Sequence, residues 1–375
     1  MNLTKSIDFL LENAVPIIRY RLRKEILHDI NPTDEENLLE QVYQTSLFKL
    51  LESYVKPNGY IGSGMHSWDN WRGTVLHRTP LEDGETAARL LSYYAIPKEH
   101  PIVVNYVAAM RNEDTLRHEF SYIPPEVERY NDRFIGMSSG FSLMILVYTM
   151  QAMLGFGDDT DAVKGFQDVC LNGFKRILEL SSVSDITKTR QSKSKYNYPY
   201  VESDEHFPCS YSLAMLAYSN SWRNAENASI VTDALNHINV IMKPDFNMHV
   251  KIGSNYYAPL GALNRPLRAF RNDLIDTILY RRVLTEITML GVGENVNIIR
   301  ESAVSIKEAI NADGILRMDF ASKHNKRYSP KNIEYPTAYI DVRLEPDYKR
   351  KYALECDLTF WAVQFLTLVE GANRQ

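Results

Sequence analysis

Hydrophobic positions along this chain recur mostly with the period of an α-helix. Ile18, Leu22 and Ile26 follow this spacing behind Pro16, a residue that suits a first helical turn. Thr33, with a glutamate three residues later, is predicted to cap the third helix through a capping box. The pattern as a whole predicts helices over residues 6–13, 16–29, 33–55, 81–96, 98–111, 134–154, 162–180, 208–217, 226–242, 273–290, 294–311 and 354–369.

The order of these helices predicts an architecture, because more apolar and amphipathic helices alternate along the chain. The connections from an apolar to an amphipathic helix are short, but the return connections are long: residues 60–80, 112–133, 181–207, 243–272 and 312–352. If the apolar helices form an inner ring, all five long loops lie on one rim, at the N-terminal ends of the inner helices. We therefore predict an all-α fold, an α/α toroid of about five to six helix pairs. Residues 1–375 would form a single domain, with N-terminal helices in 1–35 packing on the toroid. No run predicts a major sheet, although short hairpins are compatible with the long loops.

Composition and charge exclude several classes of protein. The chain is 45% hydrophobic and 24% charged, as in an ordinary globular protein, and its net charge of −5 comes without a basic tail. We therefore expect no nucleic-acid partner. No window approaches the ~18 apolar residues of a membrane span, and the N-terminus lacks the apolar core of a signal peptide. Three scattered cysteines, Cys170, Cys209 and Cys356, favour buried free thiols, and we expect a cytoplasmic protein.

Several short segments resemble the terpenoid cyclase/protein prenyltransferase α/α toroid superfamily. The closest likeness is to uncharacterised bacterial squalene-cyclase-like proteins with prenyltransferase/squalene oxidase repeats. Residues 56–62 (KPNGYIG) and 312–316 (ADGIL) resemble the family's turn between outer and inner helices. Residues 209–217 resemble the start of an inner helix, 359–366 its closing inner helix, and 16–27 the opening helix. The resemblance covers most of the chain as architecture, and it implies a central cavity that holds a ligand.

An acidic segment lies just before the apolar helix 208–217. The resemblance implies a role for it, because class II cyclases of the family protonate an alkene with a D-x-D-D segment at such a place. Glu202, Asp204 and Glu205 occupy the three acidic positions, so Asp204 is the candidate proton donor, tuned by Glu202, Glu205 and His206. Crowded or buried carboxylic acids can stay protonated and act as acids. The alternative is that these acids only stabilise the start of the next helix.

A metal site is a further reading of residues near inner-helix starts. His206, Cys209, Cys356 and Asp357 offer ligand types that zinc prefers. The order of the family's Asp-x-Cys motif is not kept, and buried cysteine is commonly a small hydrophobic residue. We therefore assign no metal and no cofactor, with zinc or magnesium left as an alternative.

The long loops also carry aromatic residues beside charged ones. Aromatic rings stack on sugar rings, and paired carboxyls serve glycoside chemistry, so Asp204 and Asp341 form a second candidate acid–base pair. The alternative is that the loops use these residues to pack on the rim. The candidate substrate-binding residues are His66, Trp68, Trp71, Arg72, His77, Tyr198, Tyr200, Tyr339 and Arg343.

Three functions remain open from the sequence. The first is an enzyme like a class II terpene cyclase, which cyclises or isomerises an isoprenoid after acid initiation. The second is a carbohydrate-active (α/α) barrel enzyme, a glycoside hydrolase or lyase. The third is a non-catalytic toroid that binds or scaffolds. The expected partner is accordingly a small molecule or an oligosaccharide in the central cavity.

Overall fold

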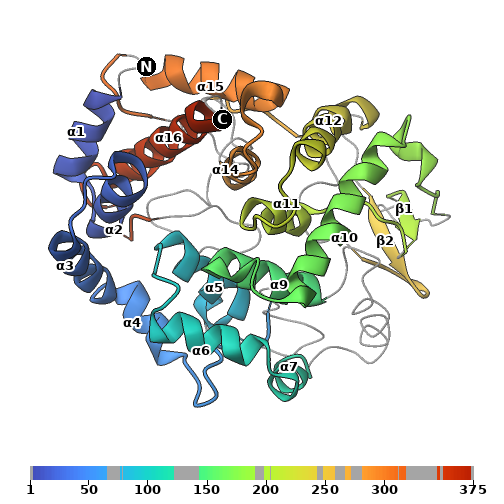
Figure 1. The fold of residues 1–375 in the computed structure, drawn as a ribbon, viewed down its shortest axis with the longest axis horizontal. Helices are drawn as coiled ribbons and strands as arrows, with labels where there is room; N and C mark the ends of the chain where they lie inside the picture. Colours follow the sequence, from blue (N-terminus) through green and yellow to red (C-terminus); the bar gives the residue numbers. More distant parts are fainter. Residues whose placement is uncertain are drawn as a thin grey trace. The chain divides into compact units, whose positions relative to one another are not determined.

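The structure is a computed structural model of the chain. It describes residues 3–65, 77, 79–121, 143–190, 198–202, 204–242, 248–257, 267–271, 281–310, 312–317, 344–346 and 349–372. Within these residues the chain is mostly α-helical, with three short strands, so the all-α prediction is confirmed (Figure 1). The chain divides into two compact units. Unit 1 comprises residues 1–119, 269–294 and 299–375, and unit 2 comprises residues 120–268 and 295–298.

Unit 1 begins with four α-helices where the hydrophobic pattern predicts three, and a π-helical segment (Leu22–Leu27) continues the second. They are α1 (Thr4–Asn13), α2 (Pro16–Arg21), α3 (Pro32–Tyr43) and α4 (Ser46–Ser53). The helix predicted over 33–55 breaks in two because Thr45 is extended and caps α4, accepting a hydrogen bond from Phe48 N. The predicted cap at Thr33 is also wrong. Asn31 caps α3 through Asp34 N, and Pro32 takes the first helical position, where its missing N–H costs nothing.

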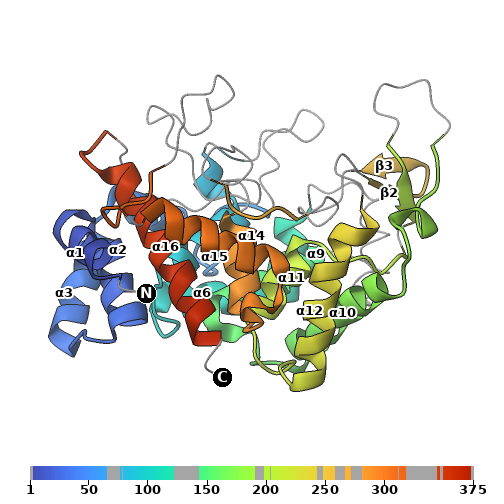
Figure 2. The ribbon, with the colours of Figure 1, turned by 90° about the horizontal axis from the view of Figure 1, so that it is seen from above.

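The remaining helices of unit 1 come from distant parts of the sequence. They are α5 (Gly84–Tyr93), α6 (Pro101–Met110), α7 (Glu113–Glu119), α14 (Arg281–Met289), α16 (Ala353–Ala372) and α15 (Asn297–Ile310), whose first two residues belong to unit 2. Helix α7 lies where the sequence predicted only loop, and Asn112 starts it by accepting Thr115 N. The N-terminal helices pack on this group. Ser6 Oγ donates to Gly314 O at 2.6 Å, and α1 runs against α16 in both ribbon views (Figures 1 and 2).

Unit 2 combines helices with a small sheet. Its helices are α9 (Leu143–Gln151), α10 (Asp161–Leu178), α11 (Ser210–Ala217) and α12 (Ala225–Ile241). Helix α10 packs on both α11 and α12, and α11 packs on α9. The strands β1 (Tyr200–Glu202), β2 (His249–Ile252) and β3 (Asn255–Tyr257) form the sheet, with β1 parallel to β2 and β2 antiparallel to β3. The β2–β3 hairpin lies in a long loop, as predicted, and Figure 2 shows it beside one end of α12.

Two helices are buried on nearly every side. All of α11 is buried, and so is all of α5 except Ser92. Helix α10, in contrast, buries one stripe that includes Val163, Phe166 and Phe174. This difference agrees with the predicted alternation of apolar and amphipathic helices. Helix α5 is exceptional because charged residues lie among its buried positions.

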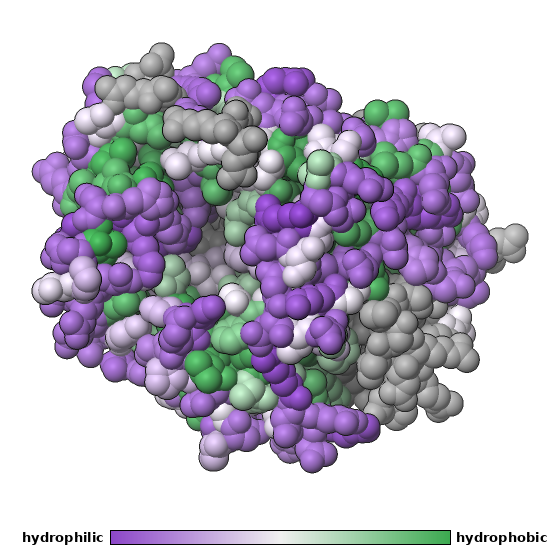
Figure 3. All heavy atoms as spheres, in the orientation of Figure 1, coloured by the Kyte–Doolittle hydropathy of each residue, from purple (hydrophilic) through white to green (hydrophobic). Residues whose placement is uncertain are grey.

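The surface and the cysteines agree with the composition. Hydrophilic residues dominate the coloured surface in the space-filling view, and hydrophobic residues reach it in smaller patches (Figure 3). Cys170, Cys209 and Cys356 are free and buried, as predicted. Among the described helices, none is long and apolar enough to cross a membrane.

Candidate functional site

The acidic segment predicted to initiate catalysis lies at and after β1, in unit 2. Asp204 is exposed and so is His206, whereas Glu202 and Glu205 are partly buried. An exposed carboxyl lacks the low-dielectric surroundings that would favour its protonated form. The geometry of the segment therefore gives no support to Asp204 as a strong proton donor.

Basic side chains hold the two glutamates of this segment. Glu202 Oε1 accepts Lys188 Nζ at 2.8 Å and lies 3.8 Å from Lys251 Nζ. Glu205 Oε1 accepts Arg176 Nε at 2.9 Å, and this hydrogen bond is the main reason that the pKa of Arg176 is raised. The two glutamates therefore pair with different cations.

The other predicted site residues fall into three groups. Tyr198 and Tyr200 lie at the sheet of unit 2, close to His249 and Tyr256. His77 is buried in unit 1, where its Nε2 forms a hydrogen bond with Ser63 O at 2.5 Å. The remaining members lie outside the described residues: His66, Trp68, Trp71, Arg72, Tyr339, Asp341 and Arg343.

The zinc alternative gains no support from the part of the chain that the structure describes. No group of three or more potential ligands comes together there. Cys209 instead exchanges contacts with Ser212 at the start of α11, where its N–H donates to Ser212 Oγ at 3.3 Å. Burial raises the pKa of the Cys356 thiol to about 12, which disfavours the thiolate that binds metal.

Unit 1 holds a group of buried charged residues that the sequence reasoning missed. We call it the buried ionic cluster, and its members are Glu85, Arg89 and Tyr93 of α5, Arg281, Arg282 and Glu286 of α14, and Asp357 of α16. Glu85, Arg89 and Glu286 are each 1% exposed or less. Charged residues are seldom buried to this degree unless they are paired, so the cluster is the strongest candidate site among the described residues.

The α5 part of the cluster is a stripe along one face of the helix. Glu85, Arg89 and Tyr93 are spaced four residues apart, which aligns their side chains one turn above another. Arg89 Nε donates to Glu85 Oε1 at 2.8 Å, and Arg89 Nη1 donates to the Tyr93 hydroxyl at 3.2 Å. The stripe therefore presents a fixed line of polar atoms inside the core.

Helix α14 brings a second acid and a second guanidinium to the Tyr93 hydroxyl. Burial raises the pKa of Tyr93, the Arg89 and Arg282 guanidiniums oppose this effect, and the Glu286 carboxylate adds to it. Arg282 Nε lies 3.7 Å from Glu286 Oε1. Two arginines and one glutamate from two helices thus act on Tyr93, while Glu85 acts on it only through Arg89.

The cluster continues from α14 to α16. Arg281 Nη2 lies 3.7 Å from Asp357 Oδ2, while Asp357 Oδ1 accepts Leu344 N at 2.9 Å. Trp361 Nε1 donates to Thr285 Oγ1 at 2.9 Å, and the Arg281 guanidinium lies 5.8 Å from the Trp361 ring centre. An aromatic ring is therefore fixed beside the charged groups.

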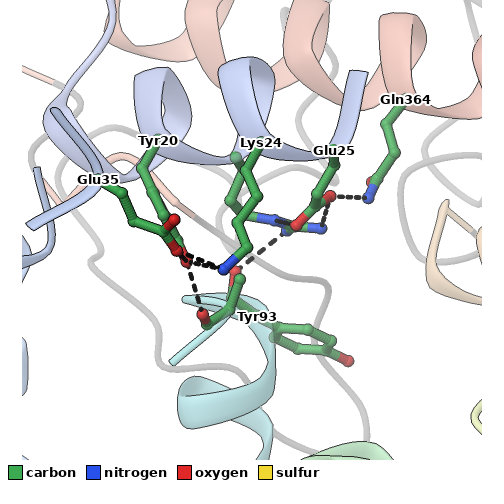
Figure 4. A network of polar contacts seen from close by, with 8 residues as sticks. Tyr20, Lys24, Glu25, Glu35, Tyr93 and Gln364 are labelled. Atoms are coloured by element: carbon green, nitrogen blue, oxygen red, sulfur yellow. Dashed lines mark hydrogen bonds and ion pairs between the residues drawn. The ribbon is translucent and has the colours of Figure 1, made fainter. Parts of the chain in front are cut away.

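A separate network holds the backbone of Tyr93 (Figure 4). Arg21 Nη1 donates to Tyr93 O at 3.1 Å, and the same guanidinium pairs with Glu25 at 2.7 and 2.8 Å. Gln364 Nε2 of α16 donates to Glu25 Oε2 at 3.2 Å. The Tyr93 ring points away from Lys24 and Glu25 in this view, so the N-terminal helices position the residue without occupying its hydroxyl.

The α5 part of the cluster has a recognisable pattern in the sequence. An acid in the first turn of a helix, such as Glu85, ordinarily stabilises the N-terminus of that helix. Glu85, Arg89 and Tyr93 nevertheless recur every fourth residue in a segment that otherwise contains small and apolar residues (GETAARLLSY). Polar residues in register within a buried helix indicate a buried polar site.

Comparisons with known proteins identify no relative of this chain. No protein-family model matches it, no curated protein matches its sequence, and no solved structure matches its fold. The resemblance to terpenoid cyclase and prenyltransferase toroids therefore stays a prediction, and functional inference depends on the residues themselves.

Proposed function

We propose that this protein is a carbohydrate-active enzyme that binds a neutral, hydroxyl-rich ligand at the buried ionic cluster. The observation that carries the proposal is the meeting of Glu85, Arg89, Tyr93, Arg282 and Glu286 inside unit 1. Two carboxyls beside a tyrosine hydroxyl are groups that general acid–base chemistry at a glycosidic bond uses. Glu85 and Glu286 take the acid and base roles, and Tyr93 orients or relays a proton.

The charge balance of the cluster favours a neutral ligand. Three arginines, Arg89, Arg281 and Arg282, face three carboxylates, Glu85, Glu286 and Asp357, so the formal charges sum to zero. An anionic ligand would need a surplus of cations. Buried ion pairs also contribute little net stability compared with apolar residues of similar size, which favours a functional reason for their presence.

The proposal includes an α/α toroid as the architecture. It is supported by the buried helices α5 and α11, each of which precedes a helix with several exposed positions in sequence. In such a fold the polar stripe of α5 would face a central cavity. The ligand would then lie among the cluster and Trp361, whose ring can stack on a pyranose.

Turnover of neutral saccharides tests the proposal. The wild-type protein is incubated with maltose, cellobiose, xylobiose and their longer homologues, and melting temperature and released reducing sugar are measured. We expect one series to raise the melting temperature and to be turned over. Glu286→Gln should lower kcat by about a hundredfold or more while leaving saccharide binding within about threefold, because it removes a proton-transfer group but keeps the shape.

Glu99→Gln is the matched control, since Glu99 is exposed and belongs to the same unit. It should leave kcat unchanged. If no saccharide is bound or turned over by the wild type, the proposal is wrong, and a non-catalytic toroid with structural ion pairs becomes the better account. An equal loss of kcat in Glu286→Gln and Glu99→Gln would also contradict the proposal.

Acid-initiated cyclisation of an isoprenoid is the second candidate function. It rests on the resemblance, which expects an acid at the place of Asp204 ahead of α11, although the side chain of Asp204 is exposed. Wild type and Asp204→Asn are incubated with squalene or geranylgeranyl diphosphate and the extracts analysed by mass spectrometry. Cyclic product from wild type alone would support this function, and its absence from wild type would exclude both substrates.

A further inference from the structure

The sheet of unit 2 has two unlike faces. Val201 is 3% exposed and Met248, next to β2, is 2% exposed, so one face lies against the interior. The register places Tyr200 beside His249, and Lys251 beside Tyr256. Because side chains alternate along a strand, these residues share the opposite face. We call it the aromatic face, and its members are Tyr198, Tyr200, Glu202, His249, Lys251 and Tyr256.

The rings of the aromatic face form a connected surface. Tyr200 and Tyr256 meet edge to face with centroids 5.0 Å apart, and Tyr198 meets His249 in the same way at 5.0 Å. Tyr198 is 36% exposed. Such rings present apolar faces and polar tips to a ligand that has both characters.

Basic side chains surround these rings. The Arg190 guanidinium lies 4.2 Å from the Tyr256 ring centre, and Lys251 Nζ lies 5.6 Å from that of Tyr200. Lys188 Nζ donates to Glu202 at 2.8 Å. Within the described residues, no carboxylate pairs with Arg190. Its place over a ring leaves the guanidinium edge able to form a bidentate contact with an anion.

The charge of this surface is positive although the chain as a whole is negative. Among the described residues, Lys188, Arg190 and Lys251 face Glu202, and the Asp204 carboxylate also acts on Lys188, which leaves a formal charge of +1, against −5 for the whole chain. His249 adds no positive charge near neutral pH, because burial and the Arg190 guanidinium lower its pKa. The surface is therefore complementary to an anion that also carries rings.

We propose that the aromatic face, with Lys188 and Arg190, binds an acidic glycan, a chain of uronic acid residues. Tyrosine rings stack on the apolar faces of the pyranoses, and Arg190 and Lys251 bind their carboxylates. Glu202 accepts hydrogen bonds from sugar hydroxyls. The site goes beyond the proposed function, because it uses residues of unit 2 and its ligand is anionic.

Binding to polygalacturonate tests this proposal with the full chain. Migration is measured in native gels that contain polygalacturonate, dextran as a neutral glycan, or poly(U). We expect polygalacturonate alone to retard the wild-type protein, with weaker retardation as NaCl rises from about 50 to about 300 mM. Arg190→Gln and Lys251→Gln should each weaken apparent binding by about fivefold to tenfold, the range of one charge-assisted contact.

Lys164→Gln is the matched control, because Lys164 is an exposed cation on α10 of the same unit. Its binding should equal that of wild type. Far-UV circular dichroism confirms that each variant is folded, and either folded variant alone can decide the result. Retardation by dextran or by poly(U) equal to that by polygalacturonate, or unchanged binding in a folded variant, would overturn the proposal. The readout is retention, so absence of saccharide turnover at the buried ionic cluster would not affect it.

Discussion

The most unusual single residue outside the candidate sites is Glu345, a buried acid in unit 1. Its side chain is 0% exposed. Oε1 accepts Arg350 Nη2 at 2.6 Å and Val15 N at 3.3 Å, and Arg350 Nη1 donates to Asn13 O at 2.6 Å. The pair thus ties the start of α2 to the segment that precedes α16. Burial raises the pKa of Glu345 to about 7, despite the opposing Arg350 guanidinium, and the Asp357 carboxylate adds to the rise.

We predict that Glu345 makes the protein less stable as pH rises. The folded pKa of about 7 exceeds the ordinary value of 4.5, so the folded state binds the proton more tightly than the unfolded chain. The stabilisation is complete below the unfolded pKa and is lost as pH rises through the folded pKa. Urea unfolding of wild type and Glu345→Gln should show their stability difference falling by about 2–3 kcal/mol between about pH 4.5 and about pH 8.

Glu99→Gln again serves as the control for this measurement, because its exposed carboxyl lies in the same unit. Its stability difference from wild type should be nearly constant over the same pH range. A Glu345→Gln curve that runs parallel to the wild-type curve would show that the carboxyl is ionised throughout.

At the scale of residues, the sequence pattern did not predict which acids are buried. Asp204 was chosen for its acidic neighbours, but it is exposed, whereas Glu85 and Glu286 are buried. Asp158 lies shortly before α10, yet it accepts hydrogen bonds from Asn220 N and Ser221 N, which lie more than 60 residues away in sequence. The residues next to Asp158 in sequence give no information about hydrogen-bond partners this far along the chain.

The elements show which local signals are dependable. Pro57, Asn58 and Gly59 were expected to end a helix, and α4 does end before them, at Ser53. A tight turn follows, in which Lys56 N donates to Tyr60 O at 2.8 Å. Gly59 and Gly62 both have positive φ values, of 84° and 72°, which only glycine adopts without cost.

We predict that Gly62→Ala destabilises the protein strongly. A Cβ at this position would overlap the carbonyl oxygen of Glu82, which is backbone and cannot swing aside. Together with the positive φ, this should cost about 2–4 kcal/mol in urea unfolding. Gly165→Ala is the matched substitution, because nothing lies within 4 Å of a Cβ there, in helix α10.

Gly165→Ala should raise stability by about 0.5–1 kcal/mol, since alanine favours a helix over glycine. A Gly62→Ala variant as stable as wild type would mean that the turn rearranges freely. In that case the close approach of residues 62 and 82 would not contribute to positioning α5.

At the scale of the whole molecule, the path of the chain bears on whether the two units unfold together. Unit 1 is assembled from three stretches of chain, and unit 2 is inserted between them. Because the chain enters and leaves unit 2 through unit 1, unfolding of unit 1 also releases the ends of unit 2. The single domain predicted from the sequence would then unfold in one step.

We therefore predict one calorimetric transition for the intact chain. Gly62→Ala in unit 1 and Asp158→Asn in unit 2 should each lower the temperature of that same transition, by about 2–3 °C, if each costs about 2 kcal/mol in a chain of this size. Two resolved transitions, each shifted by only one of the variants, would show that the units unfold independently.

The sequence by itself determined the helical class, most helices to within a few residues, the hairpin in a long loop and the buried cysteines. These features follow from local rules, since hydrophobic period, prolines and glycines act within a few residues of their own position. Tertiary structure alone decided which charged residues are buried and which of them meet. Tyr93 of α5, Glu286 of α14 and Asp357 of α16 are separated by up to 264 positions in the sequence, yet they belong to one cluster. Burial and pairing depend on the whole surrounding fold, so the sequence shows the polar stripe of α5 but not the residues of α14 and α16 that meet it.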